Sequence, residues 1–286
     1  MPPPLAVATC AAAPDLDDDA DVLRGGLRDL GVRHVVHAWD DPSVDWAEFD
    51  RVLVRSTWDY PRRRDQFLAW AESCPRTVNP ADVLRWNTDK RYLLDLERAG
   101  VPVVPTRLLP VGDTGRPAWT DVVVKPAVSG AAADTGRFPS AVDRDAQLHI
   151  ESLHRAGRDV LVQPYTHGID THGETSLVYL GDRLSHAVSR RPLLDRVGVR
   201  TPVGVADVLP TTRAVTPSRQ QVALAERALA AVPGGRGRLS YARVDLVPTA
   251  DGPAVLELEL TDCFLFLGFA APAAVRSMPA PFASGS

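Results

Sequence analysis

The chain has 286 residues, of which 45% are apolar and 24% charged, an ordinary composition for one large or two smaller globular domains. Its net charge of −4 offers no basic face to nucleic acid. No apolar run is long enough to cross a membrane, and the N-terminus lacks the basic region of a signal peptide. We therefore expect a cytoplasmic protein with no membrane or nucleic-acid partner. The three cysteines are widely spaced, which predicts reduced thiols, with no disulfide and no zinc site.

The first 80 residues predict a small α/β domain with parallel strands. Apolar runs at 5–10, 32–39 and 51–56 are typical of strands, and 15–30 is typical of a helix whose acidic first turn suits its dipole. A polar and aromatic loop follows the third strand, at the edge where open α/β sheets hold ligands. The sequence is equally consistent with a loop that packs one aromatic side chain and binds no ligand. The candidate substrate contacts in this loop are Ser56, Thr57, Trp58, Asp59 and Tyr60.

Only two of the 32 basic residues are lysines, Lys90 and Lys125. Because this chain uses arginine almost everywhere, the two lysines are candidates for sites that need a compact ammonium, as phosphate sites do. One helix is expected to open at 79–80 and a second at 87–88, which places Lys90 in a first helical turn. A cation there opposes the helix dipole unless an anion shares the site. The alternative is that Lys90 is an ordinary surface lysine without a ligand.

Lys125 ends a predicted strand at 121–125, and small residues follow it at 127–136. Such a loop lets backbone N–H groups close over phosphates, although its spacing does not match a Walker A motif. A lysine that protects an edge strand is the alternative reading.

The second half of the chain continues the alternation of strands and helices. Arg190 and Arg191 follow a hairpin that turns at Gly181-Asp182, and either could bind an anion. Residues 192–216 are expected to form an irregular excursion, and the tail after 268 has little to pack. The regular elements expected here are a strand at 160–165, a hairpin at 175–188 and an amphipathic helix at 217–231.

The stretch 241–261 predicts a second hairpin with a charged face. Because side chains two apart share a face, Arg243 lies with Asp245 and Glu257 lies with Glu259. Their gathered carboxylates suit Mg²⁺, although solvated acids on a half-exposed strand show the same alternation. The apolar partners expected to face the core are Leu256, Leu258 and Leu260.

The order of these motifs resembles the ATP-grasp superfamily of carboxylate–amine ligases over residues 1 to about 270. The resemblance is nearest to the glutathione-synthetase-like and D-alanine-ligase-like branch, including actinobacterial biosynthetic members such as the D-cycloserine synthetases. The segments that carry it are WNTDKRYLLDL, VVVKPAVSG, ARVDLVP and LELELT. It implies an α/β (α+β) ATP-grasp fold with ATP held between two α+β subdomains. The implied divisions are an N-terminal α/β domain at 1–80, a central region with the first subdomain at 81–163, a C-terminal subdomain with the metal site at 164–270, and a poorly ordered tail at 271–286.

The resemblance also implies roles for single residues. The implied ATP contacts are Lys90, Lys125, Ser129, Gly130, Gln163, Pro164, Tyr165 and Asp170. The implied ligands of Mg²⁺, for which Mn²⁺ is a substitute, are Asp245, Glu257 and Glu259. The implied catalytic residues are Arg243, Lys125 and Arg190, with Arg191 on the substrate. This chain departs from the family at Glu259, where asparagine is usual, in a phosphate loop poor in glycine, and in lacking the usual terminal helix.

The implied reaction is phosphorylation of a small amino-acid-like carboxylate by ATP, followed by attack of an amine. The amine belongs either to a second molecule or to the same one, as in a cyclo-ligase of secondary metabolism. A phosphotransferase of similar fold and a nucleotide-binding protein without catalysis are the alternatives. Homodimers are common in the family, so a homodimer is a further expectation.

Overall fold

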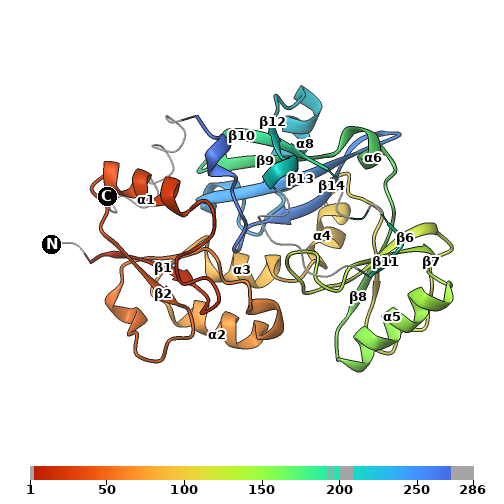
Figure 1. Ribbon diagram of the computed structural model, residues 1–286, viewed down its shortest axis with the longest axis horizontal. Helices are drawn as coiled ribbons and strands as arrows, with labels where there is room; N and C mark the ends of the chain where they lie inside the picture. Colours follow the sequence, from red (N-terminus) through yellow and green to blue (C-terminus); the bar gives the residue numbers. More distant parts are fainter. Residues whose placement is uncertain (1–2, 192–193, 195, 200–208, 272–286) are drawn as a thin grey trace.

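The computed structural model describes residues 3–191, 194, 196–199 and 209–271. The predicted excursion at 192–216 lies partly, and the predicted tail at 271–286 almost wholly, outside these residues. Three sheets make up the described part, and Figure 1 shows them as three adjoining units. Among the described residues, no helix is long and apolar enough to cross a membrane.

The N-terminal sheet is fully parallel, as the apolar runs predicted. Its order is β2-β1-β3-β4. Helix α1 (Ala20–Asp29) packs on the face that carries Val7, and α2 (Arg64–Ser73) packs on the opposite face with Ala6 and Ala8. The strands are β1 (Leu5–Thr9), β2 (His34–Ala38), β3 (Val52–Val54) and β4 (Thr77–Val78).

The central sheet is antiparallel, with the order β11-β7-β6-β8-β5, and helix α5 (Arg144–Arg155) covers one face. Val122 and Val124 pack under this helix, so the alternation along β6 turns Val123 and Lys125 to the other face. The sequence analysis predicted β6 and β8 but not β5, β7 or α5. The strands are β5 (Arg107–Leu109), β6 (Thr120–Pro126), β7 (Gly136–Ser140), β8 (Val160–Pro164) and β11 (Gly198–Val199).

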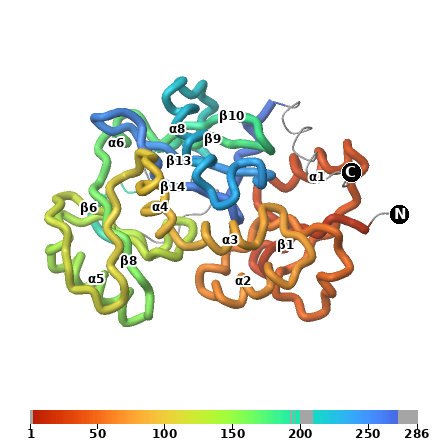
Figure 2. Tube along the Cα trace, turned by 180° about the vertical axis from the view of Figure 1, so that it is seen from behind, coloured from red at the N-terminus to blue at the C-terminus, as the bar shows by residue number. Residues whose placement is uncertain are grey.

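The third sheet is also antiparallel and has the order β12-β10-β9-β13-β14. Both predicted hairpins are confirmed in it, β9 with β10 and β13 with β14. Helices α4 (Tyr92–Arg98) and α8 (Arg219–Ala230) bury one face of the sheet, as Figures 1 and 2 show from opposite sides. The strands are β9 (Glu174–Leu180), β10 (Arg183–Arg190), β12 (Arg213–Ala214), β13 (Tyr241–Thr249) and β14 (Gly252–Glu259).

Short helices complete the described chain. The remaining α-helices are α3 (Ala81–Asn87) and α6 (Gly168–His172). The 3-10 helices are η1 (Trp46–Glu48), η2 (Tyr60–Arg62), η3 (Leu209–Thr211), η4 (Arg236–Arg238) and η5 (Leu267–Phe269).

Strand β14 is the edge of the third sheet, and two asparagines bond backbone groups at the start of β13 and around the end of β14. Asn79 donates to the carbonyl groups of Tyr241 and Leu260 at 2.9 and 2.7 Å. Asn87 donates to the carbonyl group of Leu258 at 2.6 Å and accepts the N–H group of Leu260 at 2.8 Å. These contacts fasten the edge strand to the segment that follows the N-terminal sheet. Asn87 therefore ends α3 and does not cap the next helix, contrary to the prediction.

Helix α1 is shorter than predicted because the acidic residues ahead of it have other partners. Asp17 and Asp19 lie buried against Arg55, at 3.2 and 3.3 Å. Asp19 also accepts the backbone N–H groups of Leu265 and Leu267, at 2.8 and 2.6 Å. The acidic residues thus hold the segment after β14 on the N-terminal sheet and do not form the first turn of a helix.

A bulge between Asp245 and Leu246 changes one predicted direction in the second hairpin. Val255 takes the place opposite Leu246, and Leu256 falls between the paired positions. Leu256 therefore packs against a different apolar cluster from Leu258. Leu258 and Leu260 face the core as predicted, whereas the prediction for Leu256 was wrong.

Candidate active site

The charged face of the β13–β14 hairpin is confirmed by the strand register. Arg243 lies directly opposite Glu259, and Asp245 lies directly opposite Glu257. Residues that oppose each other in an antiparallel pair project to the same side. Helices cover the apolar side of this sheet, so the four charged side chains face the other units.

Asp245 is the most heavily bonded carboxylate of this face. Arg243 donates to it from Nε and Nη2, at 2.9 and 2.8 Å, and Ser176 donates at 2.6 Å. Arg190 forms a further ion pair with it at 3.2 Å. Burial disfavours the charge of Asp245, but the two guanidinium groups hold its pKa below the usual range. Asp245 is thus an ionised carboxylate, able to serve a metal ion.

Glu174 is a buried acid of the site that the sequence analysis did not identify. It opens β9 and pairs with Arg190 across the neighbouring strand. Burial raises the pKa of Glu174 to about 7, and Arg190 opposes that rise. The alternation of Glu174 and Ser176 along β9 was the available signal. The pair fixes the guanidinium of Arg190, whose other partner is Asp245.

Lys90 joins three parts of the site but lies outside the predicted helix. It sits in the turn ahead of α4, and its backbone N–H donates to the carbonyl of Ala127 at 2.8 Å. Its ammonium donates to the carbonyl of Ser129 at 2.6 Å and pairs with Glu257 at 2.9 Å. Because Lys90 lies ahead of α4, the expected opposition between its charge and the helix dipole does not apply. The contacts of Lys90 join the small-residue loop to the hairpin.

Lys125 is buried without an ion pair among the residues the structure describes. Its exposed fraction is 7%, and burial lowers its pKa, with Glu257 attracting and Lys90 repelling its charge. It is not the exposed edge lysine of the alternative reading, because β6 pairs on both sides. A buried ammonium without a paired carboxylate favours binding of an anion such as phosphate.

Glu257 and Glu259 differ in charge although they are two residues apart. Burial disfavours both, but Lys90 and then Lys125 hold the pKa of Glu257 below its usual range. Burial and the neighbouring Glu257 raise the pKa of Glu259 to about 8, while Arg243 lies 3.7 Å away. Glu257 thus lies closest to the ammonium groups, whereas Glu259 lies on the side of Arg243.

No three acidic, histidine or cysteine side chains of the described residues are placed to bind a metal by themselves. Magnesium commonly uses one or two carboxylates together with phosphates and water, so Asp245 and Glu257 fit such a shared site. The three-carboxylate set, which includes Glu259, stays a prediction.

The small-residue loop after β6 has a left-handed backbone at Ala131, Ala132 and Asp134. Non-glycine residues adopt this conformation at a cost of about 1 kcal/mol each. Ser129 is buried, and Gly130 lies against Pro61 of the N-terminal unit, where an added Cβ would come within 3.7 Å. Ser129 and Gly130 thus lie where the central unit, the N-terminal unit and Lys90 meet.

The residues implied for the adenine end lie at the end of β8. Gln163 is buried and donates to Thr106 at 2.9 Å, and Pro164 is the last residue of the strand. Tyr165 donates its backbone N–H to Asp121 at 2.6 Å and its hydroxyl to Asp170 at 2.5 Å. Asp170 is thus held beside the hinge, and its contact with ribose stays a prediction.

The loop predicted to contact substrate divides into buried and exposed parts. Ser56 and Thr57 are fully buried, while Trp58 is 48% exposed. Asp59 accepts the indole N–H of Trp39 at 2.9 Å and also pairs with Arg63, which is a structural role. Tyr60 is buried in the same aromatic core, and Arg191 is exposed beyond β10. Of this loop, Thr57 donates to Asp262 at 3.4 Å, and Tyr60 lies within electrostatic range of Asp262, Glu259 and Glu257.

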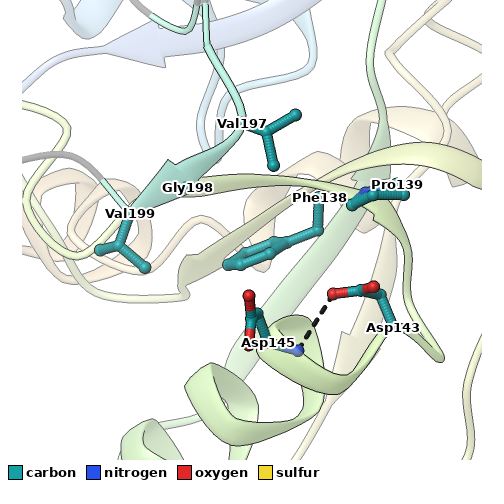
Figure 3. A pocket seen from close by; sticks show the side chains of 7 residues that line it. All are labelled: Phe138, Pro139, Asp143, Asp145, Val197, Gly198 and Val199. Atoms are coloured by element: carbon teal, nitrogen blue, oxygen red, sulfur yellow. Dashed lines mark hydrogen bonds between the residues drawn. The ribbon is translucent and has the colours of Figure 1, made fainter.

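A surface pocket of about 350 Å³ lies apart from these residues, on the central unit. Figure 3 shows it beside the start of α5, where Asp143 accepts the N–H group of Asp145 at 3.0 Å. None of the residues implied for ATP or metal lines it. The lining residues are Phe138, Pro139, Asp143, Asp145, Val197, Gly198 and Val199.

Comparison with known proteins agrees with this geometry. Residues 5–81 match the family model of the D-cycloserine synthetase DcsG N-terminal domain. The chain is 35% identical over 291 residues to the cycloserine biosynthesis protein DcsG of Streptomyces lavendulae, covering 95% of both proteins. The crystal structure of D-cycloserine synthetase DcsG has a TM-score of 0.87 at 34% identity, covering 97% of this chain and 98% of that one. The D-alanine–D-alanine ligase of Bacillus anthracis complexed with ATP has a TM-score of 0.65 at 15% identity, covering 96% and 94%.

The fold and the charged site define an ATP-grasp enzyme, a ligase that uses ATP to join a carboxylate to an amine. The ATP-grasp fold and the superfamily resemblance are thereby confirmed, and the phosphotransferase alternative is not favoured. The chain belongs to the D-cycloserine synthetase DcsG family. The division into four segments and the roles of single residues stay predictions.

Proposed function

We propose that the protein phosphorylates the carboxylate of a small amino-acid-like substrate with Mg·ATP and closes an amide-type bond within the same molecule. One observation carries the proposal. Lys90 and Lys125, from two different segments, converge with Glu257 of the hairpin, and Lys125 is buried without an ion pair among the described residues. Two ammonium groups beside a carboxylate form a site for a metal-bound polyphosphate.

The residues have separate roles in the proposed reaction. A carboxylate oxygen attacks the γ-phosphorus of ATP, ADP leaves, and Lys90 and Lys125 balance the charge of the transferred group. Bound Mg²⁺ supplies charge neutralisation at the phosphates, and Asp245 and Glu257 are its proposed ligands. The amine nitrogen then attacks the acyl carbon, its proton is lost and phosphate leaves. Arg243 faces the same region and stabilises the oxyanion, a role typically worth about 3 kcal/mol.

Family membership supports the cyclising form of the reaction. Two relatives that are 35% and 34% identical over at least 95% of the chain are a cycloserine biosynthesis protein and a D-cycloserine synthetase, so D-cycloserine is the proposed product. We place the enzyme in the cytoplasm, where ATP is available, and propose antibiotic biosynthesis as its context. A homodimer, common among related ligases, is a further proposal.

The test is nucleotide release with pooled amino acids, with and without hydroxylamine. We expect ADP and, with hydroxylamine, a hydroxamate, because hydroxylamine captures an acyl phosphate. ADP without a hydroxamate in any pool would favour a phosphotransferase, and AMP would contradict the ATP-grasp mechanism.

The site assignment is tested with Lys125→Ala and Glu257→Gln in the same assay. We expect ADP release to fall by about a hundredfold or more, because each change removes a charge that balances the phosphoryl group. Circular dichroism checks that both variants keep the fold. Near-native turnover of either variant would contradict the assignment.

A further inference from the structure

Asp262 is a carboxylate beside the site with no assigned role. It lies three residues after Glu259, where the chain leaves the edge strand towards the N-terminal sheet. Its only hydrogen-bond donor from another side chain in the described part of the molecule is Thr57, at a long 3.4 Å. No cationic side chain of the described residues lies within ion-pair distance of it.

The nearest guanidinium is already engaged. Arg55 pairs with Asp17 and Asp19 and donates to the carbonyl of Cys263 at 3.2 Å. Burial raises the pKa of Asp262 to about 7, although a backbone hydrogen bond, Arg55 and Thr57 oppose that rise. Asp262 is only partly exposed and has no ion pair among the described residues, and carboxylates of this kind are concentrated where a ligand completes the pairing.

The surroundings of Asp262 place it between the N-terminal loop and the phosphate-binding lysines. Thr57 is fully buried at this junction, and its hydroxyl is the side-chain group that contacts Asp262. The charge of Asp262 acts on both Tyr60 and Lys90, so the group lies near the phosphate end of the site. The Thr57 hydroxyl and a carboxylate without an ion pair among the described residues are complementary to an ammonium group with three donors.

We propose that Asp262, with Thr57, binds the ammonium group of an amino-acid substrate and so directs its carboxylate towards Lys90 and Lys125. The inference rests on the proposed function, and it names the residues that would recognise the free primary amine of the amino-acid substrate. Asp262 is then a binding residue for the substrate and not a ligand of the nucleotide.

The test measures ligand binding separately from turnover. The full-length protein with Mg·ADP is titrated with pooled amino acids and with the matching 2-hydroxy acids, which lack the amine. Intrinsic tryptophan fluorescence, to which the exposed Trp58 contributes, and the thermal midpoint report binding. The variants are Asp262→Asn, Asp262→Glu and Thr57→Val. The matched control is Asp251→Asn, on the exposed turn that joins β13 to β14.

We expect Asp262→Asn to raise the half-saturating concentration of the amino-acid pool by about tenfold or more, because a charge-assisted pair is lost. Asp262→Glu should restore part of this loss, and Thr57→Val should show a smaller one. Half-saturation by Mg·ATP and binding of the hydroxy acids should stay within about twofold of wild type, as should every value for Asp251→Asn.

Unchanged amino-acid binding by Asp262→Asn would overturn the proposal, as would a wild-type protein that binds neither pool or does not distinguish them. A selective loss of Mg·ATP binding would also overturn it, because Asp262 would then serve the nucleotide or its metal. If Asp262→Asn does not fold, the result for Thr57→Val decides. Amine-dependent binding without ADP or hydroxamate formation would refute the proposed function but leave this subsite standing.

Discussion

Replacing Arg55 by methionine should destabilise the protein strongly, because this arginine neutralises two buried acids at once. Its side chain is 2% exposed and pairs with Asp17 and Asp19, themselves 2% and 1% exposed. It also donates to the carbonyl of Cys263, so it joins the N-terminal sheet to the segment after β14. Methionine has a similar length but supplies neither charge nor donors.

The expected loss follows from the burial of the group. Removing one partner of a buried ion pair typically costs about 3–5 kcal/mol, since the remaining charge is left without compensation. At about 2–4 °C of thermal midpoint for each kcal/mol in a chain of this size, Arg55→Met should unfold about 6–20 °C below wild type.

The loss should also depend on pH. Burial already raises the pKa of Asp19 to about 6, and Arg55 opposes that rise, so the variant's value should be higher still. A carboxyl whose folded pKa lies above its unfolded value, near 4, stabilises the fold at low pH. That contribution is lost as the pH rises through the folded value. The destabilisation by Arg55→Met should therefore be smaller at about pH 5 than at about pH 8.

Thermal unfolding at both pH values checks the prediction. Arg98→Met is the matched control, because Arg98 is 72% exposed and pairs with Asp95 on the surface. Its midpoint should stay within about 2 °C of wild type. An Arg55→Met midpoint equally close to wild type at the higher pH would refute the reasoning. A larger loss at the lower pH would refute the assigned role of the carboxylates.

Three further substitutions test how backbone conformation and backbone hydrogen bonds position the site. Gly173→Ala should cost about 2 kcal/mol or more, because φ is +74° and the added Cβ would lie 2.5 Å from the carbonyl oxygen of Arg190. Gly181→Ala, at φ +61° with open space around it, should cost only about 1 kcal/mol, and equal urea midpoints would contradict the predicted clash. Asn79→Ala should cost about 3 kcal/mol, because it leaves two carbonyl groups and one N–H group of the hairpin segment unsatisfied. A free energy of unfolding within about 1 kcal/mol of wild type would show that this asparagine does not hold the edge strand.

Much of the architecture was predictable because it depends on local periodicity. Apolar runs identified the parallel N-terminal strands, and turn signals identified both antiparallel hairpins. The alternation along β13 and β14 was enough to place Arg243, Asp245, Glu257 and Glu259 on one face. In the central unit β5 and β7 are short and only partly apolar, whereas α5 was missed although its amphipathic pattern and the capping Asp143 were available signals.

Long-range contacts decided what local patterns could not. The amphipathic pattern at 15–30 could not show that Asp17 and Asp19 pair with Arg55 and therefore lie outside the helix. Arg55 is distant from both in sequence, so no local pattern reveals the pairing. A bulge reversed the direction of Leu256, since one unpaired residue shifts the alternation that the prediction assumed.

The sequence by itself determined the chemistry of the site: two lysines in an arginine-rich chain, and a hairpin with an arginine and three carboxylates on one face. Only the tertiary structure decided which of these groups meet. It paired Lys90 with Glu257, left Lys125 buried without an ion pair among the described residues, and set Asp262 beside Thr57. The physical reason is that side-chain direction follows from local backbone periodicity, whereas desolvation and charge pairing depend on segments brought together by folding.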